Sequence, residues 1–198
     1  MKLLYIGDIS RQDALLLYKY ASKATNVLEF GSGASTQVLA QTPATITSIE
    51  TEQTWIDKTK QNLKDLNLKE VNFIHWDNRQ SVYNVAYEVI FNDGYDVLRK
   101  QFFNEVFGGL KIGGKLLVHD TRCPNIWLYE VIHEHINEIE DISPNQDDSN
   151  ITVITKGEVK PYKNWHIEES RDMWEFTNSE KPADWKDILL RKAPETGI

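Results

Sequence analysis

Short apolar or β-branched runs alternate with segments of helical periodicity along most of this chain. The runs are typical of strands buried on both faces, and they predict strands over residues 27–30, 45–50, 71–77, 87–94, 115–120 and 150–155. Between them, apolar residues recur at three- to four-residue spacing. This spacing predicts helices over 12–24, from 35 or 36 to before 43, and over 54–66, 97–108 and 124–136. Such alternation forms right-handed βαβ units, so the pattern predicts an α/β fold with a mainly parallel sheet.

Acidic residues lie at or near the ends of five of these strands. They are Glu29, Glu50, Asp77, Asp93 and Asp120. Parallel strands bring their carboxyl ends to one edge of the sheet, and open α/β sheets bind ligands at that edge. The recurrence of acids at strand ends therefore predicts a binding site there.

A glycine turn joins the first predicted strand to the next helix. Because glycine has no Cβ, Gly31 and Gly33 allow backbone to approach a ligand closely. The helix N-terminus that follows offers free N–H groups to an anionic group. A dinucleotide-binding turn would carry a third glycine where Thr36 stands. A nicotinamide or other nucleotide ligand, and a purely structural turn, remain alternatives.

Composition restricts the class of protein. The chain has 198 residues, of which 40% are hydrophobic and 26% charged, and a net charge of −8, so a nucleic-acid surface is not expected. No apolar run is long enough to span a membrane, and the N-terminus does not resemble a secretory signal. Cys123 is the only cysteine, which favours a reducing, cytoplasmic location. We expect one domain over 1–158 and a tryptophan-containing extension over 159–198 that packs on it.

Residues 27–155 resemble the class I S-adenosylmethionine (SAM)-dependent methyltransferases. In that family an acid precedes the glycine turn, as in Glu29-Phe30-Gly31-Ser32-Gly33, and an acid ending the second strand binds the ribose hydroxyls, as Glu50 would. Ser35 stands where the family often has a third glycine, and its hydroxyl could cap the helix. The resemblance implies a Rossmann-like fold with a seven-stranded, mainly parallel sheet, helices on both faces, and SAM as cofactor.

Within that class, the pattern is most similar to the small O-methyltransferases of the catechol and caffeoyl-coenzyme A type. The resemblance implies that Trp55 and Tyr95 cover the two faces of adenine and that Asp77 and Asn78 meet its edge. Trp55 could instead belong to the core, and Glu29 could either contact the cofactor or orient the turn. The residues that the resemblance assigns to the cofactor are Glu29, Gly31, Ser32, Gly33, Ser35, Thr36, Glu50, Trp55, Asp77, Asn78, Asp93 and Tyr95.

Metal-dependent members of this group hold a divalent cation with a carboxylate after the fourth strand and an Asp-Asn pair after the fifth. Asp93 and Asp120 match two of these ligands, whereas Thr121 replaces the asparagine. Asp96 also stands where the group has a basic residue. The resemblance therefore offers only a partial ligand set for a metal.

Asp93, His119 and Asp120 are the candidate catalytic residues. A neutral imidazole at His119 could accept the proton of an attacking hydroxyl, although a histidine packed under the helices is an alternative. If the strand continues, alternation would turn His119 and Asp120 to opposite faces. Arg99 and Arg122 could bind an acidic acceptor or be solvated, and His133 and His135 are expected at the surface, with a metal site there a minor alternative.

The sequence thus predicts a SAM-dependent methyltransferase that transfers to oxygen on a small-molecule or sugar-like acceptor. Two other classes stay open at this point. One is a module that binds SAM or a nucleotide without turnover, and the other is a nicotinamide-dependent oxidoreductase.

Overall fold

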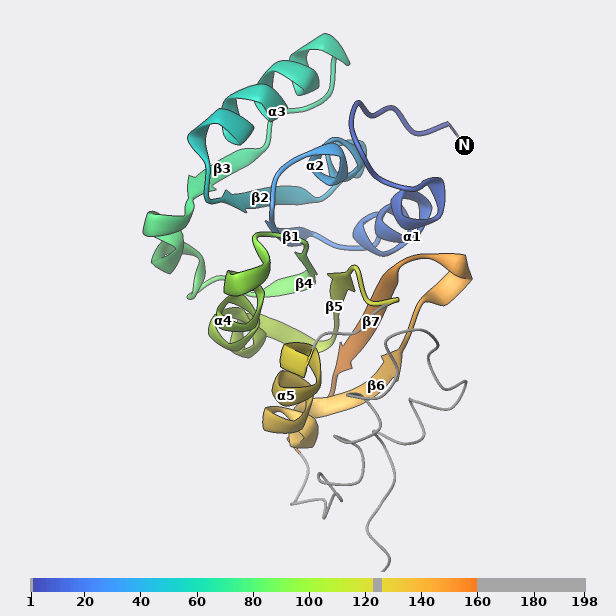
Figure 1. The fold of residues 1–198 in the computed structure, drawn as a ribbon, viewed down its shortest axis with the longest axis vertical. Helices are drawn as coiled ribbons and strands as arrows, with labels where there is room; N and C mark the ends of the chain where they lie inside the picture. The colour runs from blue at the N-terminus through green and yellow to red at the C-terminus, as the bar shows by residue number, and fades with distance from the viewer. Residues whose placement is uncertain (1, 123–125, 160–198) are drawn as a thin grey trace, which may run out of the picture.

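The computed structural model describes residues 2–122 and 126–159. The predicted extension therefore lies, beyond Val159, outside the described residues, as does Cys123. The helices of these two segments are α1 (Arg11–Ala21), α2 (Ala34–Leu39), α3 (Gln53–Asp65), α4 (Asp96–Val106) and α5 (Ile126–Glu134). The strands are β1 (Asn26–Phe30), β2 (Thr45–Glu50), β3 (Asn72–His75), β4 (Tyr87–Asn92), β5 (Leu110–His119), β6 (Ile139–Ser143) and β7 (Ile151–Lys156) (Figure 1).

The strands form one seven-stranded sheet in the order β3-β2-β1-β4-β5-β7-β6. β1 to β5 pair in parallel, whereas β7 pairs antiparallel with both β5 and β6. The expected seven-stranded, mainly parallel sheet is confirmed. The chain leaves β1 towards β2 and β3 on one side and returns to β4 on the other. The carboxyl ends of β1 and β4 are therefore neighbours at a switch in strand order, where open sheets bind ligands.

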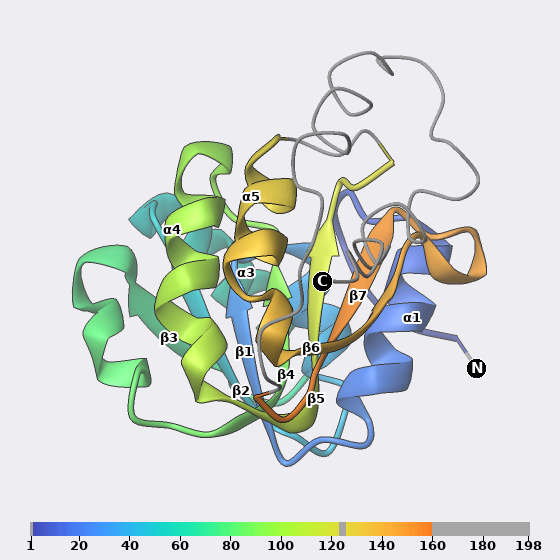
Figure 2. The same ribbon diagram turned by 90° about the horizontal axis from the view of Figure 1, so that it is seen from below.

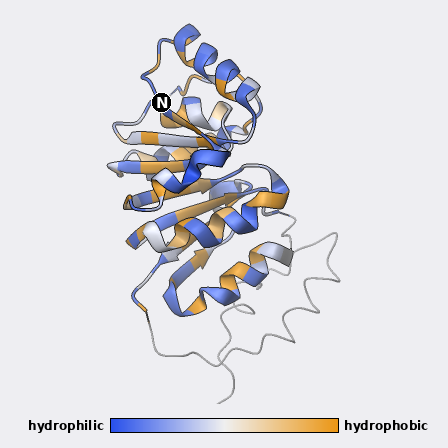
Figure 3. Ribbon diagram, turned by 90° about the vertical axis from the view of Figure 1, so that its left-hand side faces the viewer, coloured by the Kyte–Doolittle hydropathy of each residue, from blue (hydrophilic) through white to orange (hydrophobic). Residues whose placement is uncertain are grey.

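Helices cover both faces of the sheet, α1, α2 and α3 on one and α4 and α5 on the other (Figure 2). Figure 3 shows the hydrophobic residues gathered on the strands and on the inward sides of the helices. One core lies between the sheet and α4 and α5, and includes Leu28, Phe30 and Phe102. The other lies against α1 and α2, and includes Leu17, Val27 and Phe91. None of the helices in the described segments is long and apolar enough to cross a membrane.

The structure differs from the prediction at β5, at β6 and at two histidines in and just after α5. The glycine pair before it was expected as a turn, but Leu110–His119 forms one long strand whose register with β4 shifts between Tyr87 and Val89. β6 was not predicted, because its sequence Ile139–Ser143 is short and mostly acidic or polar.

His133 and His135 are not exposed as expected. They pack against Tyr129 and Phe107, at ring-centroid distances of 4.3 and 4.7 Å.

The side chain of Glu29 points to the face of the sheet that α1 and α2 cover, because side chains alternate along β1. Leu28 and Phe30 of β1 enter the opposite core, so Glu29 between them points towards α2. Its carboxylate accepts hydrogen bonds of 2.6 Å from the hydroxyls of Ser35, Thr36 and Ser48. Glu29 is fully buried and thereby connects β1, α2 and β2 directly behind the glycine turn. This position favours the orienting role over direct contact with a cofactor.

Burial raises the pKa of Glu29 to about 7, even though three hydroxyl donors favour its charged form. Between pH 4.5 and 7 the folded protein therefore holds a proton that the unfolded chain has released. Stability from this group should fall as the pH rises through that window, by about 3 kcal/mol in total.

We expect Glu29→Gln to lose this component of the pH dependence, because glutamine does not ionise. Urea unfolding of both proteins at about pH 5 and about pH 8 measures it as the difference between their pH slopes. Equal slopes for the two proteins would show that Glu29 is already ionised in the folded state at low pH.

Candidate functional site

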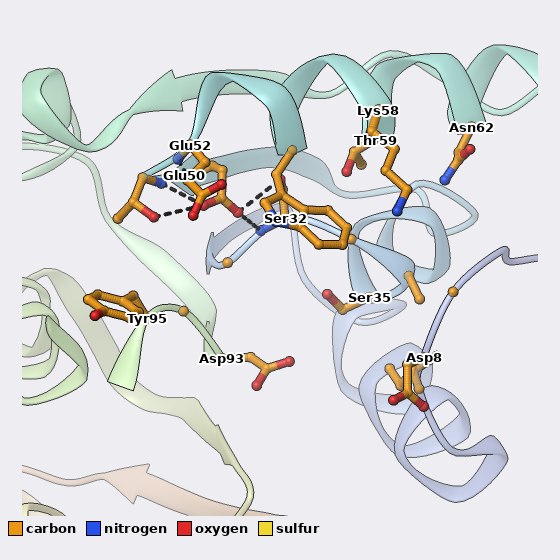
Figure 4. Close-up of a pocket in the computed structure, with 18 of the residues that line it drawn as sticks. Asp8, Ser32, Ser35, Glu50, Glu52, Lys58, Thr59, Asn62, Asp93 and Tyr95 are labelled. Carbon is orange, nitrogen blue, oxygen red and sulfur yellow. Dashed lines mark hydrogen bonds between the residues drawn. The ribbon is translucent and has the colours of Figure 1, made fainter. Parts of the chain in front are cut away.

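A cavity of about 520 Å³ opens at the carboxyl ends of β1, β2 and β4. The glycine turn after β1 forms its floor, α3 one wall, and the segment after β4 another (Figure 4). It brings together many of the predicted cofactor residues, which are Gly31, Ser32, Gly33, Ser35, Glu50, Trp55, Asp93 and Tyr95.

The backbone of the turn is shaped by two glycines with different roles. Gly31 has a φ of +93°, and a Cβ there would lie 2.5 Å from the carbonyl oxygen of Asp93. Gly31 therefore lets the loops after β1 and β4 pack against each other. Gly33 has extended backbone, and no atom lies within 4 Å of a Cβ built on it. A side chain at Gly33 would be accommodated by the fold but would narrow the cavity that it lines.

Glu50 at the end of β2 carries the most densely bonded carboxylate in the cavity. One oxygen accepts from the backbone N–H and the hydroxyl of Ser32, at 2.8 and 3.1 Å. The other accepts from the N–H and hydroxyl of Thr51, at 2.6 and 3.0 Å, and from the N–H of Glu52 at 3.2 Å. The backbone N–H groups fix the carboxylate, while the two hydroxyls can rotate away. Each of its oxygens can therefore exchange one hydroxyl partner for a hydroxyl of a ligand.

Two aromatic residues lie on opposite walls of the cavity. Trp55 of α3 exposes 42% of its surface, so it is not a core residue, and Lys58 Nζ lies 4.3 Å from the centre of its ring. Tyr95, which precedes α4, exposes 62% and lies across the cavity from Lys58 (Figure 4). A flat ligand between these walls could stack on aromatic surface from either side.

Four predicted cofactor residues do not line this cavity. Glu29 and Thr36 are fully buried behind the turn, where the Thr36 hydroxyl accepts from the N–H of Gly33 at 2.9 Å. Asp77 and Asn78 are exposed on a short 3₁₀ helix, Trp76–Val82, after β3. The first pair therefore supports the turn, and a role for the second pair at an adenine edge stays a prediction.

A second cavity, of about 630 Å³, adjoins the first and shares Asp8, Ile9 and Asp93 with it. The residues that line it are almost all polar. They are Asp8, Ile9, Ser10, Gln12, Asp13, Asp93, His119, Asp120, Arg122, Asp148 and Asn150. The two cavities together provide one site for each of two small ligands, with Asp93 between them.

His119 connects three carboxylates in this second cavity. Its Nδ1 lies 3.1 Å from Asp93 and 3.2 Å from Asp120, and its Nε2 lies 3.3 Å from Asp13. Burial alone would lower the pKa of His119, but hydrogen bonds to Asp120, Asp13 and Asp93 raise it to about 12. The surrounding carboxylates thus favour the imidazolium form of the ring over the neutral imidazole that could accept a proton.

The backbone at Asp120 explains why it meets His119. β5 ends at His119, and Asp120 has a φ of +59°, in the left-handed region that aspartate tolerates. The condition under which alternation would separate the two side chains is not met, because the strand ends at His119. The hydrogen bond from His119 lowers the pKa of Asp120 despite partial burial.

Arg99 is neither solvated nor free to bind an acceptor. It is 5% exposed on α4, and its Nη2 lies 3.1 Å from Asp93 Oδ1 and 3.4 Å from Asp120 Oδ2. Its Nε donates to the carbonyl of Gly94 at 2.8 Å, and its Nη1 to that of His119 at 3.2 Å. A fixed cation thus bridges the loops after β4 and β5. Arg122 is exposed and lines the second cavity.

The residues here do not fit the divalent metal of the O-methyltransferase pattern. Donor atoms of Asp93, His119 and Asp120 lie within 4.8 Å of one another, as metal ligands would. However, the carboxylates already accept from Arg99, and Asp93 lies within hydrogen-bond distance of the His119 ring. The hydroxyl of Thr121 donates to Asn145 Oδ1 at 3.1 Å instead of facing the two acids.

Sequence reasoning missed Asp13. It lies on the buried side of α1 with Ala14 and Leu17, and it accepts from the hydroxyl of Ser10 and the N–H of Asn150. Burial would raise the pKa of Asp13, but the hydrogen bonds from His119 and Ser10 lower it. The signal that could have found it is an acid at an otherwise apolar position of an amphipathic helix, which needs a buried partner.

Comparison with solved structures identifies the fold of this chain. No model of a known protein family and no curated protein matches the sequence. A protein assigned as a caffeoyl-CoA O-methyltransferase from Staphylococcus aureus aligns over 77% of this chain and 86% of its own, with 21% identity and a TM-score of 0.63. An O-methyltransferase from Bacillus cereus, solved with S-adenosylhomocysteine (SAH), aligns over 75% and 83%, with 18% identity and a TM-score of 0.61. The chain has the fold of the O-methyltransferases.

A third structure of this methyltransferase fold was solved with SAM. It is the O-methyltransferase of tomaymycin synthesis from Streptomyces achromogenes, which aligns over 76% of this chain and 82% of its own, with 15% identity and a TM-score of 0.57. At these identities the comparisons establish the fold, and the assignment of activity depends on the site.

The two glycines provide a matched pair of variants. Gly31→Ala should lower the free energy of unfolding by about 2 kcal/mol or more, because it combines a left-handed φ with a clash against Asp93. Gly33→Ala should change stability by less than about 1 kcal/mol yet weaken SAH binding by protruding into the cavity. Urea unfolding and calorimetric titration measure the two effects. Equal destabilisation by both variants would contradict the different roles.

The protonation state of His119 can be observed directly. We expect the ¹⁵N signals of its ring to show an imidazolium at about pH 8, above the range in which ordinary histidines are protonated. His119→Gln assigns the signals. A neutral tautomer at this pH would restore the general-base interpretation.

Proposed function

We propose that this protein is a SAM-dependent methyltransferase that transfers the methyl group to oxygen on a small polar acceptor. The observation that carries the proposal is the pair of adjoining cavities. One has a glycine floor, a fixed carboxylate and exposed aromatic walls, and the other is polar. The single cysteine is in keeping with a cytoplasmic location.

The first cavity suits the nucleoside of SAM. Glu50 would accept the two ribose hydroxyls in the places now taken by the hydroxyls of Ser32 and Thr51. Trp55 and Tyr95 offer aromatic surface for adenine, and Lys58 would move from the ring that it now covers. When bound, SAM supplies a methyl group already activated by a sulfonium, so the protein mainly positions the reactants and excludes water.

The second cavity suits an acceptor that carries several hydroxyl groups. Among the described residues that line this cavity, Ile9 is the one apolar residue, and none is aromatic. Carboxylates and the amide of Asn150 can accept from and donate to hydroxyls, whereas an aromatic acceptor would find little apolar surface.

The carboxylates of Asp93 and Asp120 would then orient the attacking hydroxyl at the junction of the cavities. One of them would accept the proton that this hydroxyl loses on methylation, with SAH as the leaving group. His119 acts as a positioning residue that holds both acids in place through its hydrogen bonds. A nicotinamide reaction is less well supported, because the Thr36 side chain is buried in the turn where the dinucleotide pattern has glycine.

Titration with SAH tests the proposal. We expect micromolar binding by wild type and at least about tenfold weaker binding by Glu50→Ala, which corresponds to about 1.4 kcal/mol. Glu70→Ala removes the same charge from an exposed position outside the cavity and should bind like wild type. Thermal unfolding checks that each variant is folded.

Two results would contradict the proposal. Absence of SAH binding by folded wild type would exclude SAM as the cofactor, and a parallel titration with NADH would test the oxidoreductase alternative. Tight SAH binding without methyl transfer to any of a panel of polyhydroxylated acceptors would favour a module that binds without turnover.

A further inference from the structure

Arg99 lies between the two acids that match the metal-binding carboxylates of the O-methyltransferase pattern. Asp93 follows β4 and Asp120 follows β5, and one nitrogen of Arg99, Nη2, contacts a carboxylate oxygen of each. Asp96 also approaches Nε at 3.1 Å from its exposed position. Every nitrogen of the guanidinium therefore has an acceptor, including two backbone carbonyls at the same strand ends.

This arrangement is built into the fold. Arg99 is almost completely buried, and burying a guanidinium without partners would be very costly. Asn92 at the end of β4 donates to the carbonyl of Arg99 at 3.1 Å and so fixes the backbone of α4 at this residue. Without the Arg99 side chain, the two acids would repel each other and the two carbonyls would lose their hydrogen-bond donor.

Two cations already lie against the two acids at this position, where Asp13 and Asp96 add one further carboxylate each. Asp93 and Asp120 contribute two negative charges, and Arg99 and His119 lie in contact with both. The ring nitrogen that faces the acids makes hydrogen-bond contacts with two carboxylates, which requires an N–H and leaves no lone pair for a metal. A divalent cation would have to displace the guanidinium and the ring of His119 from the two acids.

We propose that Arg99 takes the place of the divalent cation, so that this chain has an internal organic cation where metal-dependent members of the fold bind a metal. Arg99 is then a positioning residue that holds the ends of β4 and β5 at the junction of the two cavities. That methyl transfer itself needs no metal follows only if the proposed function is correct. The replacement of the ion by Arg99 does not depend on it.

The test is Mn²⁺ binding followed by electron paramagnetic resonance, with the full-length chain in chelator-treated buffer. Wild type should bind no Mn²⁺ up to about 1 mM, the range of weak carboxylate sites. Arg99→Ala frees Asp93 and Asp120 and should gain a Mn²⁺ site, and added Mn²⁺ should raise its melting temperature. A purely structural role for Arg99 would destabilise the variant without creating a site.

Arg79→Ala is the matched control. Arg79 forms a bidentate ion pair with Glu105 at 2.7 and 2.9 Å, away from the site. Its removal therefore frees one carboxylate and not two neighbouring ones. It should gain no Mn²⁺ site. Arg99→Lys keeps a positive charge and should also bind no Mn²⁺. If Arg99→Ala is unfolded without metal, recovery of its thermal transition on addition of Mn²⁺ supports the proposal.

Two outcomes would overturn it. One is Mn²⁺ binding by wild type that is lost in Asp120→Asn, and the other is a folded Arg99→Ala protein that binds no Mn²⁺. Both are distinguishable from failure of the proposed function, because that failure appears as lost SAH binding in metal-free buffer, which these titrations do not measure.

Discussion

Carboxylates that converge on one edge of a sheet repel one another, and this structure depends on how that repulsion is balanced. Asp13, Asp93 and Asp120 come from α1 and from the ends of β4 and β5, and they meet around His119. In a partly buried position such acids would either take up protons or separate. The ring of His119 and the guanidinium of Arg99 lie between these acids and hold them close together. The cations therefore hold both the shape and the charge of the second cavity.

A different solution operates at the neighbouring strand ends. Glu29 forms no ion pair within the described part of the chain. It accepts from three hydroxyls, and burial raises its pKa to about 7. Glu50 is held mainly by backbone N–H groups and keeps contact with the first cavity. Neutral N–H and O–H groups are the donors to Glu29 behind the turn and to Glu50 beside it. A compact group of acids needs positive charge. In the function that we propose, the different environments of these acids would separate support of the turn, binding of a nucleoside and orientation of an acceptor.

The two cavities are coupled through a short segment after β4. The Asp93 carbonyl packs against Gly31 of the first cavity, while the Asp93 side chain contacts His119 and Arg99 of the second. A change in either cavity therefore acts on the same residue. In the methyl transfer that we propose, this coupling would hold the two bound molecules at a fixed separation.

The sequence by itself determined the α/β class, the order of most strands and helices, and the location of the glycine turn and Glu50. These features are local or periodic, so spacing and residue type carry them. β6 escaped because its pattern is short and polar, and only pairing with β7 makes it a strand. Only the tertiary structure decided the state of His119 and the role of Arg99. Their partners lie up to 106 residues away in the sequence, and both depend on a left-handed backbone at Asp120 and on burial that no local pattern encodes.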